Sequence, residues 1–292
     1  MSNYTTKIRN ILNPPATKNI TQLPSTGRAG RNLPAAIGVA IVLGGLVALM
    51  LLYLPQAFVY FAILMVLLGL YEFAGAVKNQ GINVALLPMW IGSIGMGLCA
   101  HLISTQAMLV SYFVTLLFIV LWVFTDTKSK KALVDVAVSI LGVTWISLLG
   151  SFLILFLMRP LGNYYVLAFI LIVIASDTGG YAVGVLIGKH PMSKKISPKK
   201  SWEGLIGSLT FSSLAAVSTM PYLGYSYKES VIIGIITSIV AVIGDLCESL
   251  IKRDLKMKDM GNLLPGHGGV LDRTDAILIA TIPYTALLYF MG

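Results

Sequence analysis

The chain has 292 residues, of which 57% are hydrophobic and only 11% are charged, and its mean hydropathy is +0.84. Apolar runs of roughly 20 residues recur along it, and each matches the length that a helix needs to cross a bilayer. Soluble folds are therefore excluded. The net charge of +9 needs no nucleic-acid partner, because basic cytoplasmic loops face an anionic leaflet.

The hydropathy pattern predicts an all-α, polytopic integral membrane protein with about nine transmembrane helices. In chain order the predicted spans are 33–54, 57–77, 85–104, 107–125, 133–158, 164–187, 203–222, 229–250 and 274–291.

The positions of Lys and Arg predict the orientation. With the N-terminus in the cytoplasm, all of the 21 basic residues except Arg159 and Lys228 fall on the cytoplasmic side, as the positive-inside rule requires. Residues 1–32 are polar and basic, and we expect a disordered cytoplasmic tail there. Residues 33–292 are predicted to form one membrane-embedded domain.

Small residues gather in several spans. The segments GSIGMG (92–97) and GGLVA (44–48) are predicted to let helices approach closely. The segment ASDTGGYAVG (175–184) combines such glycines with Asp177. An acid at membrane depth is costly, so function is the default hypothesis for Asp177, and a structural hydrogen bond is the alternative. Glu72 poses the same question, with an interfacial position near Lys78 as its alternative.

The loop 188–202 carries lysines directly before a predicted helix. Lys199 and Lys200 precede Ser201, a suitable N-cap residue, and the helix dipole together with the lysines suits phosphate. The positive-inside rule alone would account for the presence of some of these lysines in a cytoplasmic loop. Glu203 is either a functional acid or ordinary compensation of the helix dipole. His190, like His101, has no acidic partner at ligand spacing and is predicted to be non-catalytic.

The predicted eighth span ends with polar residues on one helix face. Asp245, Glu248, Ser249 and Lys252 stand at i, i+3, i+4 and i+7, and therefore share that face. Their oxygens suit Mg²⁺, which takes one or two carboxylates and fills its other positions with water and substrate phosphate.

The next span begins with a similar set. Asp272 and Asp275 are one helical turn apart with Arg273 between them, after the turn PGHGG that contains His267. If the two helix ends meet, the acids can hold a metal while basic side chains bind phosphate oxygens. His267 could contact phosphate or serve as an acid, and a structural role is equally open.

These residues resemble the phosphatidate cytidylyltransferases, also called CDP-diacylglycerol synthases. Residues 249–275 fit S-x-x-K-R, then K-D, then P-x-H-G-G, then D-R-x-D at every defined position, which is far more specific than a lone glycine motif. ISPKKSWEG (196–204) and ASDTGGYAVG also resemble family segments, so the match covers about 170–292, the predicted active-site half. Val185 departs from the basic residue and Ser201 from the Thr that relatives often carry.

The resemblance implies that phosphatidate attacks the α-phosphorus of CTP and expels pyrophosphate at the cytoplasmic face of a bacterial-type plasma membrane. It implies a magnesium ion, with a second cation left open. The implied roles, by residue, are metal binding by Asp245, Asp272, Glu248 and Asp275; catalysis by Asp245, Lys252, Asp272, Arg273 and Asp275; substrate binding by Lys199, Lys200, Ser201, Ser249, Arg253 and His267; and support by Asp177 and Glu203.

Two other functions share features with this sequence. A secondary transporter also buries acids, but here the charged groups cluster at one membrane face and no matching pair of broken helices is found. A lipid-phosphate transferase that uses a CDP-linked donor would carry an acid-rich helix that is missing upstream of Asp272. Membrane lipid is an expected partner, and the sequence leaves a homodimer open.

Overall fold

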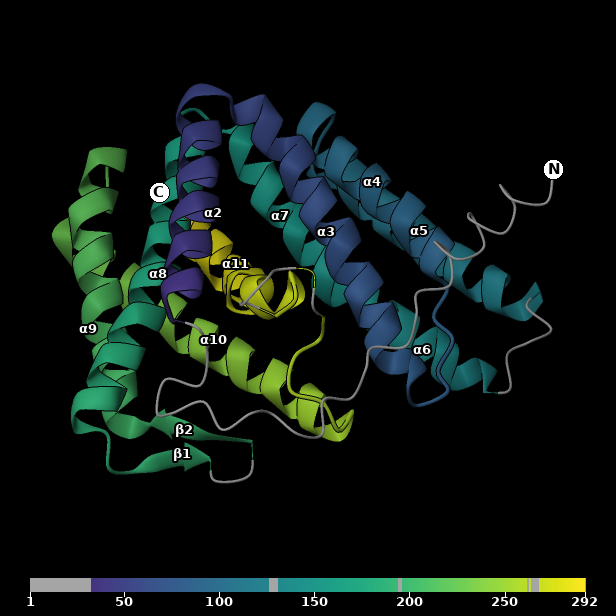
Figure 1. Ribbon diagram of the computed structural model, residues 1–292. Helices are drawn as coiled ribbons and strands as arrows, with labels where there is room; N and C mark the ends of the chain where they lie inside the picture. The colour runs from purple at the N-terminus through teal and green to yellow at the C-terminus, as the bar shows by residue number, and fades with distance from the viewer. Residues whose placement is uncertain (1–32, 126–130, 194–195, 262, 264–267, 292) are drawn as a thin grey trace. The chain divides into compact units, whose positions relative to one another are not determined.

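The computed structural model describes residues 33–125, 131–193, 196–261, 263 and 268–291 (Figure 1). The α-helices are α2 (Leu33–Tyr53), α3 (Pro55–Lys78), α4 (Leu86–Leu102), α5 (Thr105–Thr125), α6 (Ala132–Gly142), α7 (Leu149–Leu155), α8 (Gly162–Ile187), α9 (Trp202–Thr219), α10 (Tyr227–Asp254) and α11 (Leu271–Met291). Shorter elements are the π-helical turn η1 (Val143–Leu148), the 3-10 turns η2 (Phe156–Met158) and η3 (Met220–Leu223), and the strands β1 (Pro191–Ser193) and β2 (Ser197–Ser201).

The predicted all-α class is confirmed for the described residues, where the one exception is the antiparallel hairpin of β1 and β2. Each of the nine predicted spans coincides with helix. Six of them are long and apolar enough to cross a membrane, namely α3, α5, residues 132–158, α8, α10 and α11. The number of nine spans and the cytoplasmic N-terminus stay predictions, and the predicted disordered tail 1–32 lies outside the described residues.

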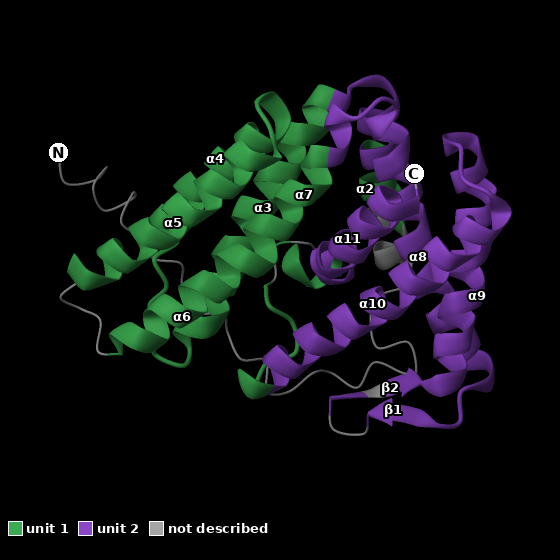
Figure 2. Ribbon diagram, turned by 180° about the vertical axis from the view of Figure 1, so that it is seen from behind, with its two compact units in different colours: residues 1–46, 56–155, 254–273 green, residues 47–55, 156–253, 274–292 purple. Residues whose placement is uncertain are grey.

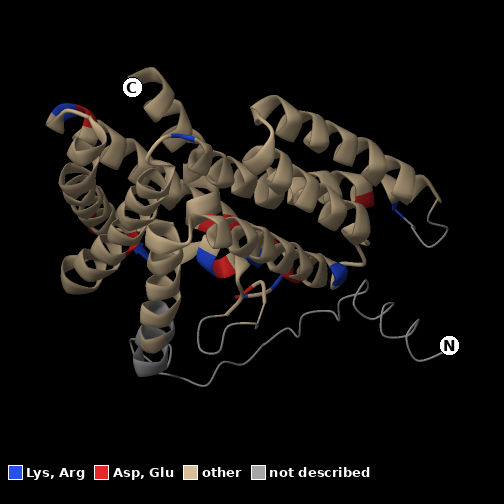
Figure 3. Ribbon diagram, turned by 90° about the horizontal axis from the view of Figure 1, so that it is seen from above, with Lys and Arg blue, Asp and Glu red and all other residues tan. Residues whose placement is uncertain are grey.

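The outer surface of these helices is apolar. On α5, the exposed side chains include Val110, Phe113, Leu117, Leu121 and Phe124. Figure 3 shows the same feature as long stretches of ribbon without any charged residue. Because a helix pairs its backbone polar groups internally, such a surface is suited to lipid.

The described chain divides into two compact units (Figure 2). Unit 1 comprises residues 1–46, 56–155 and 254–273, and unit 2 comprises residues 47–55, 156–253 and 274–292. The two units hold different parts of the predicted site, and each is described by itself below.

In unit 1, small residues let α4 approach its neighbours. A Cβ atom on Gly92 would overlap the Thr115 side chain of α5, and one on Gly97 would lie 2.7 Å from the Ile63 side chain of α3. The prediction of close approach at 92–97 is therefore confirmed. The same prediction for GGLVA is wrong, because Gly44 and Gly45 are exposed and no described atom lies within 4 Å of a Cβ built on either.

In unit 2, glycines bring the backbones of α8 and α9 together. A Cβ on Gly179 would lie 2.6 Å from the carbonyl oxygen of Gly207, and one on Gly204 would lie 2.9 Å from that of Gly180. The Ser208 hydroxyl on α9 donates to the carbonyl oxygen of Ser176 on α8 at 2.8 Å. These contacts confirm that the glycines around Asp177 permit close helix approach.

Candidate active site

The start of α9 is capped as predicted. The Ser201 hydroxyl oxygen accepts a hydrogen bond from the backbone N–H of Gly204 at 3.1 Å, which satisfies one of the four N–H groups that a helix start leaves unpaired. The hydroxyl is buried and stands against Gly188, where a Cβ would lie 2.7 Å away. The oxygen predicted to bind substrate thus already has a structural role, while its O–H stays able to donate.

Glu203 has a partner that sequence spacing did not reveal. Its carboxylate lies 2.5 Å from the Nδ1 atom of His190 and accepts from the backbone N–H groups of Lys189 and His190 at 3.1 and 3.2 Å. This partner lies outside any ligand spacing in the sequence, and the predicted non-catalytic role of His190 stays a prediction. The residues are 13 positions apart, and the chain reversal of the hairpin brings them together. Glu203 organises the turn that leads into β1.

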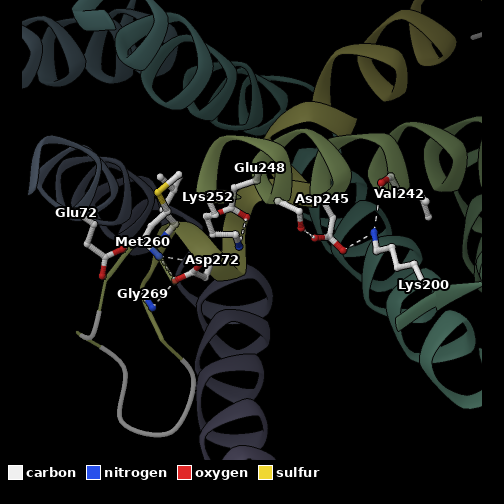
Figure 4. Close-up of polar contacts among 11 residues, drawn as sticks. Glu72, Lys200, Val242, Asp245, Glu248, Lys252, Met260, Gly269 and Asp272 are labelled. Carbon is white, nitrogen blue, oxygen red and sulfur yellow. Dashed lines mark hydrogen bonds and ion pairs between the residues drawn. The ribbon is translucent and has the colours of Figure 1, made fainter. Parts of the chain in front are cut away.

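Asp245 on α10 contacts Lys200 of β2 and Ser249 of its own helix, all within unit 2 (Figure 4). One carboxylate oxygen, Oδ2, forms an ion pair with Lys200 Nζ at 2.5 Å, and the other, Oδ1, accepts from the Ser249 hydroxyl at 3.4 Å. Lys200 also donates to the carbonyl oxygen of Val242 at 3.4 Å. The structure thus places the end of β2 beside the acidic face of α10.

Deeper on the same face lies a buried ion pair. Glu248 is fully buried, and its Oε2 atom lies 3.2 Å from Lys252 Nζ one turn further along α10, where the Lys252 side chain is 12% exposed. The contacts of Asp245 with Ser249 and of Glu248 with Lys252 confirm that the four predicted residues share one helix face.

Asp275 of α11 joins this cluster. The residue is 7% exposed, and its carboxyl group interacts with the Glu248 side chain and lies within electrostatic range of Asp245 and Lys252. Gly244 explains the approach, since a Cβ there would lie 3.0 Å from the Ile279 side chain and 3.5 Å from the Asp275 carbonyl oxygen. Unit 2 thus gathers three carboxyl groups against two ammonium groups, which we call the α10 cluster: Lys200, Asp245, Glu248, Lys252 and Asp275.

Asp272 belongs to unit 1, where it binds backbone (Figure 4). Its carboxylate accepts from the N–H of Met260, with Oδ2 at 2.9 Å and Oδ1 at 3.1 Å, and from the N–H of Gly269 at 2.8 Å. The residue therefore fastens two stretches of the polypeptide that precede α11. Each carboxylate oxygen has two acceptor sites, so capacity for a cation remains.

Glu72 is buried beside the two stretches that Asp272 fastens. The sequence did not indicate this position. The residue is 4% exposed, and its Oε2 atom accepts from the backbone N–H of Leu271 at 2.9 Å. A Cβ on Gly261 or on Gly269 would overlap its carboxyl group. The side chain is enclosed by protein, while the predicted position of Glu72 near the membrane interface stays a prediction.

Asp259 is an acid to which sequence reasoning assigned no role. A Cβ on Gly268 would lie 3.1 Å from Asp272 Oδ2 and 3.2 Å from Asp259 Oδ1, and Gly268 has a φ of +84°, a conformation that favours glycine. The sequence did contain a sign of this acid, because Lys258 and Asp259 form the K-D step of the motif. No role was predicted for that step.

The remaining predicted residues are more peripheral. Arg253 donates from Nε to the carbonyl oxygen of Ile196 at 3.3 Å, which ties the end of α10 to the hairpin. Lys199, Arg273 and Asp177 have exposed side chains, and their predicted roles stay predictions. His267 lies outside the described residues.

The predicted magnesium site can be compared with the side chains that the structure brings together. Within the described ranges, no group of three or more His, Cys, Asp or Glu side chains is arranged to hold a metal by itself. Magnesium does not require such a group, because it takes one or two carboxylates and completes its shell with water and phosphate oxygens. Asp245, beside the carboxyl groups of Glu248 and Asp275, offers hard oxygen donors and negative charge, so the residues fit.

Comparison with known proteins covers nearly the whole chain. The model of the cytidylyltransferase family matches residues 34–291. The chain is 34% identical over 280 residues to the phosphatidate cytidylyltransferase of Mycobacterium leprae (strain TN), with 90% of each chain covered. It is 36% identical over 270 residues to that of Mycobacterium bovis, with 88% of each covered. For Staphylococcus aureus (strain COL) the values are 31% over 206 residues, 70% of this chain and 75% of the relative. The resemblance drawn from the motifs is confirmed.

Proposed function

The chain belongs to the cytidylyltransferase family, and on that premise we propose that it transfers the cytidylyl group of CTP to phosphatidate, giving CDP-diacylglycerol and pyrophosphate. The observation that carries the proposal is the name shared by the relatives, phosphatidate cytidylyltransferase, which match this chain over 70–90% of its length. The α10 cluster supports it, because closely spaced acidic and basic groups suit a charged phosphate substrate.

The reaction needs no protein nucleophile. An oxygen of the phosphatidate phosphate attacks the α-phosphorus of CTP, a new P–O bond forms, and the bond between the α-phosphorus and the bridging oxygen breaks. Pyrophosphate leaves with that electron pair. The lipid phosphate is ionised at neutral pH and is therefore a competent nucleophile, so the protein contributes positioning and compensation of charge in an in-line displacement.

In this proposal the basic residues hold phosphate. Lys200 and Lys252, which now neutralise Asp245 and Glu248, exchange these contacts for phosphate oxygens when substrate arrives. Lys199, Ser201, Ser249, Arg253, Arg273 and His267 are proposed to complete substrate binding on the basis of the motifs. Asp177 and Glu203 are proposed as supporting residues.

A divalent cation, magnesium in our proposal, would be held by Asp245, with Glu248, Asp275 and Asp272 contributing. Asp272 is included because it belongs to the D-R-x-D part of the motif. When bound, the ion would polarise phosphoryl oxygens and neutralise their developing charge. The acidic side chains orient and retain the ion, while the neighbouring ammonium groups keep an excess of carboxylates tolerable at the membrane. A second cation is left open.

The six long apolar helices indicate a multi-pass membrane protein. We propose that it resides in the plasma membrane with the α10 cluster at the cytoplasmic face, in agreement with the positions of the basic residues. Phosphatidate then reaches the site from the inner leaflet, and CTP reaches it from the cytosol.

The test is a product assay on purified protein in detergent with phosphatidate, labelled CTP and Mg²⁺. We expect CDP-diacylglycerol and pyrophosphate in equal amounts, both dependent on phosphatidate. Asp245→Asn should lower the rate by about 100-fold or more, because it removes the proposed cation ligand. Asp254→Asn, which alters an acid at the end of the same helix outside the α10 cluster, is the matched control.

Two results would contradict the proposal. A protein that consumes no CTP in the presence of phosphatidate is not the proposed enzyme, and a transporter would release no pyrophosphate. Near-normal activity of Asp245→Asn would remove Asp245 from the cation site, although the assignment of the reaction would stand.

A further inference from the structure

Two carboxyl groups hold the polypeptide that enters α11, and only one of them belongs to the motif. Asp272 lies in the first turn of α11, whereas Glu72 comes from α3, nearly 200 positions earlier in the sequence. Both lie in unit 1 with the segments that they contact. Glu72 has so far been given no part in the proposed reaction.

Glu72 caps α11 from outside the helix. Leu271 is the first residue of α11, and its N–H therefore has no acceptor within the helix. Glu72 Oε2 accepts this bond at 2.9 Å. A carboxylate at a helix N-terminus also interacts favourably with the helix dipole. The backbone of Val270 interacts with the same carboxyl group, so Glu72 contacts both the end of the loop and the start of the helix.

Each of two backbone stretches contacts both carboxyl groups. In the first, Met260 donates its N–H to Asp272, and the adjacent Gly261 presents its Cα to the Glu72 carboxyl group. In the second, Gly269 does both, since its N–H donates to Asp272 Oδ2 at 2.8 Å and a Cβ on it would overlap Glu72. Figure 4 shows Gly269, Met260 and Asp272 grouped near Glu72.

This arrangement explains why glycine occupies positions 261 and 269. Both glycines lie against the carboxyl group of Glu72, a residue that is 4% exposed. Any side chain would push that group away and would lengthen the hydrogen bonds that the same backbone makes to Asp272. A carboxyl group this deeply buried costs free energy unless hydrogen bonds compensate for the lost water, and here the backbone N–H of Leu271 supplies such a bond.

We propose that Glu72 is a positioning residue for Asp272: it clamps residues 259–261 and 268–271 against α3, and thereby sets the orientation of the Asp272 carboxylate for the reaction. The inference rests on the proposed function for its catalytic consequence. The clamp itself is a statement about the protein alone and can be tested without substrates.

The first test measures hydrogen exchange in the full chain in detergent, without CTP, lipid or divalent cation. In Glu72→Ala, peptides that contain Met260 and Gly269 should exchange about tenfold faster than in the wild type, because the Leu271 N–H loses its acceptor and the two stretches that donate to Asp272 are no longer held. Glu72→Gln keeps an acceptor oxygen and should exchange at an intermediate rate. The matched control is Glu229→Gln, which alters a carboxylate that binds the Ser226 backbone N–H at 2.7 Å near the start of α10. Unchanged exchange in Glu72→Ala overturns the clamp.

The second test separates positioning from a general loss of structure. In Glu72→Ala, the Mg²⁺ concentration for half-maximal product formation should rise about tenfold, while kcat at saturating Mg²⁺ changes far less, because the supporting contact of a cation ligand is lost. A fall in kcat with unchanged Mg²⁺ dependence would overturn the positioning role. A wild type that makes no CDP-diacylglycerol would refute the proposed function, and the exchange test of the clamp would still apply.

A double substitution tests the contact directly. Gly269→Ala should impair activity in the wild type, where the new methyl group meets the Glu72 carboxyl group. It should cost little more in the Glu72→Ala background, where that group is absent. Equal losses in both backgrounds would show that the effect of Gly269→Ala does not pass through Glu72, and would contradict the inference.

Discussion

At the scale of single residues, the candidate site contains an ion pair that is buried, Glu248 with Lys252. Glu248 is fully buried and Lys252 is 12% exposed. Removing both charges of such a pair can be nearly neutral for stability, whereas removing one leaves an uncompensated charge in a medium of low dielectric. The Glu248–Lys252 pair should therefore matter for stability as well as for substrate binding.

Replacing Lys252 tests this point. Lys252→Met should lower the free energy of unfolding by about 3 kcal/mol, because Glu248 loses its counter-charge. The double variant Glu248→Gln/Lys252→Met should regain most of this loss. Thermal unfolding in detergent, without substrates, measures both effects.

Lys228→Met is the matched control, since Lys228 is exposed near the other end of α10. The argument fails if Lys252→Met melts with the wild type, or if the double variant is no more stable than Lys252→Met alone.

At the scale of elements, glycines decide which helices approach one another. Sequence segments rich in small residues look alike, yet they differ in what faces them. Gly179 lies against the backbone of Gly207, whereas a Cβ on Gly44 would meet no described atom within 4 Å. Close packing thus depends on the neighbour, and the local sequence carries no information about it.

Alanine at these two positions should have opposite consequences. Gly179→Ala should destabilise the protein by about 2 kcal/mol, because the methyl group meets the Gly207 carbonyl oxygen and the Phe211 side chain. Gly44→Ala should leave stability unchanged or raise it slightly, since alanine favours a helix over glycine. Thermal unfolding of the two variants, side by side, decides the matter. A larger loss in Gly44→Ala than in Gly179→Ala would refute the packing argument.

At the scale of the whole molecule, membrane insertion follows from composition. In the part of the chain that the structure describes, six helices are long and apolar enough to cross a membrane. Arg159 and Lys228 are the basic residues that the predicted topology places outside. That topology puts the hairpin β1–β2 in the cytosol and the turn η3 outside.

Cysteine labelling in intact cells checks the orientation. In a background with Cys99→Ser and Cys247→Ser, a cysteine at Tyr222 (87% exposed in η3) should react with an impermeant maleimide. A cysteine at Lys189, before the hairpin, should react only after the membrane is opened. The reverse pattern would invert the predicted topology, and labelling of both from outside would refute the single predicted span, 203–222, that separates the two labelled sites.

The sequence by itself determined the helical class, the membrane environment, the family and the charged residues that gather in the α10 cluster. These properties depend on apolar runs of sufficient length and on residue types at local spacing, such as Asp245, Glu248 and Lys252 on one face of α10. Both the length of an apolar run and the local spacing of residue types can be determined from a short stretch of sequence. Helical periodicity alone therefore placed the α10 face correctly.

The tertiary structure alone decided which distant groups meet. His190 reaches Glu203 through a chain reversal, Lys200 reaches Asp245 across 45 positions, and Glu72 reaches Leu271 across 199 positions. Such pairings result from the packing of whole helices and the path of the loops, and no periodicity along the chain encodes them. For the same reason, the sequence indicated that Glu72 is costly to bury but not what its carboxyl group holds in place.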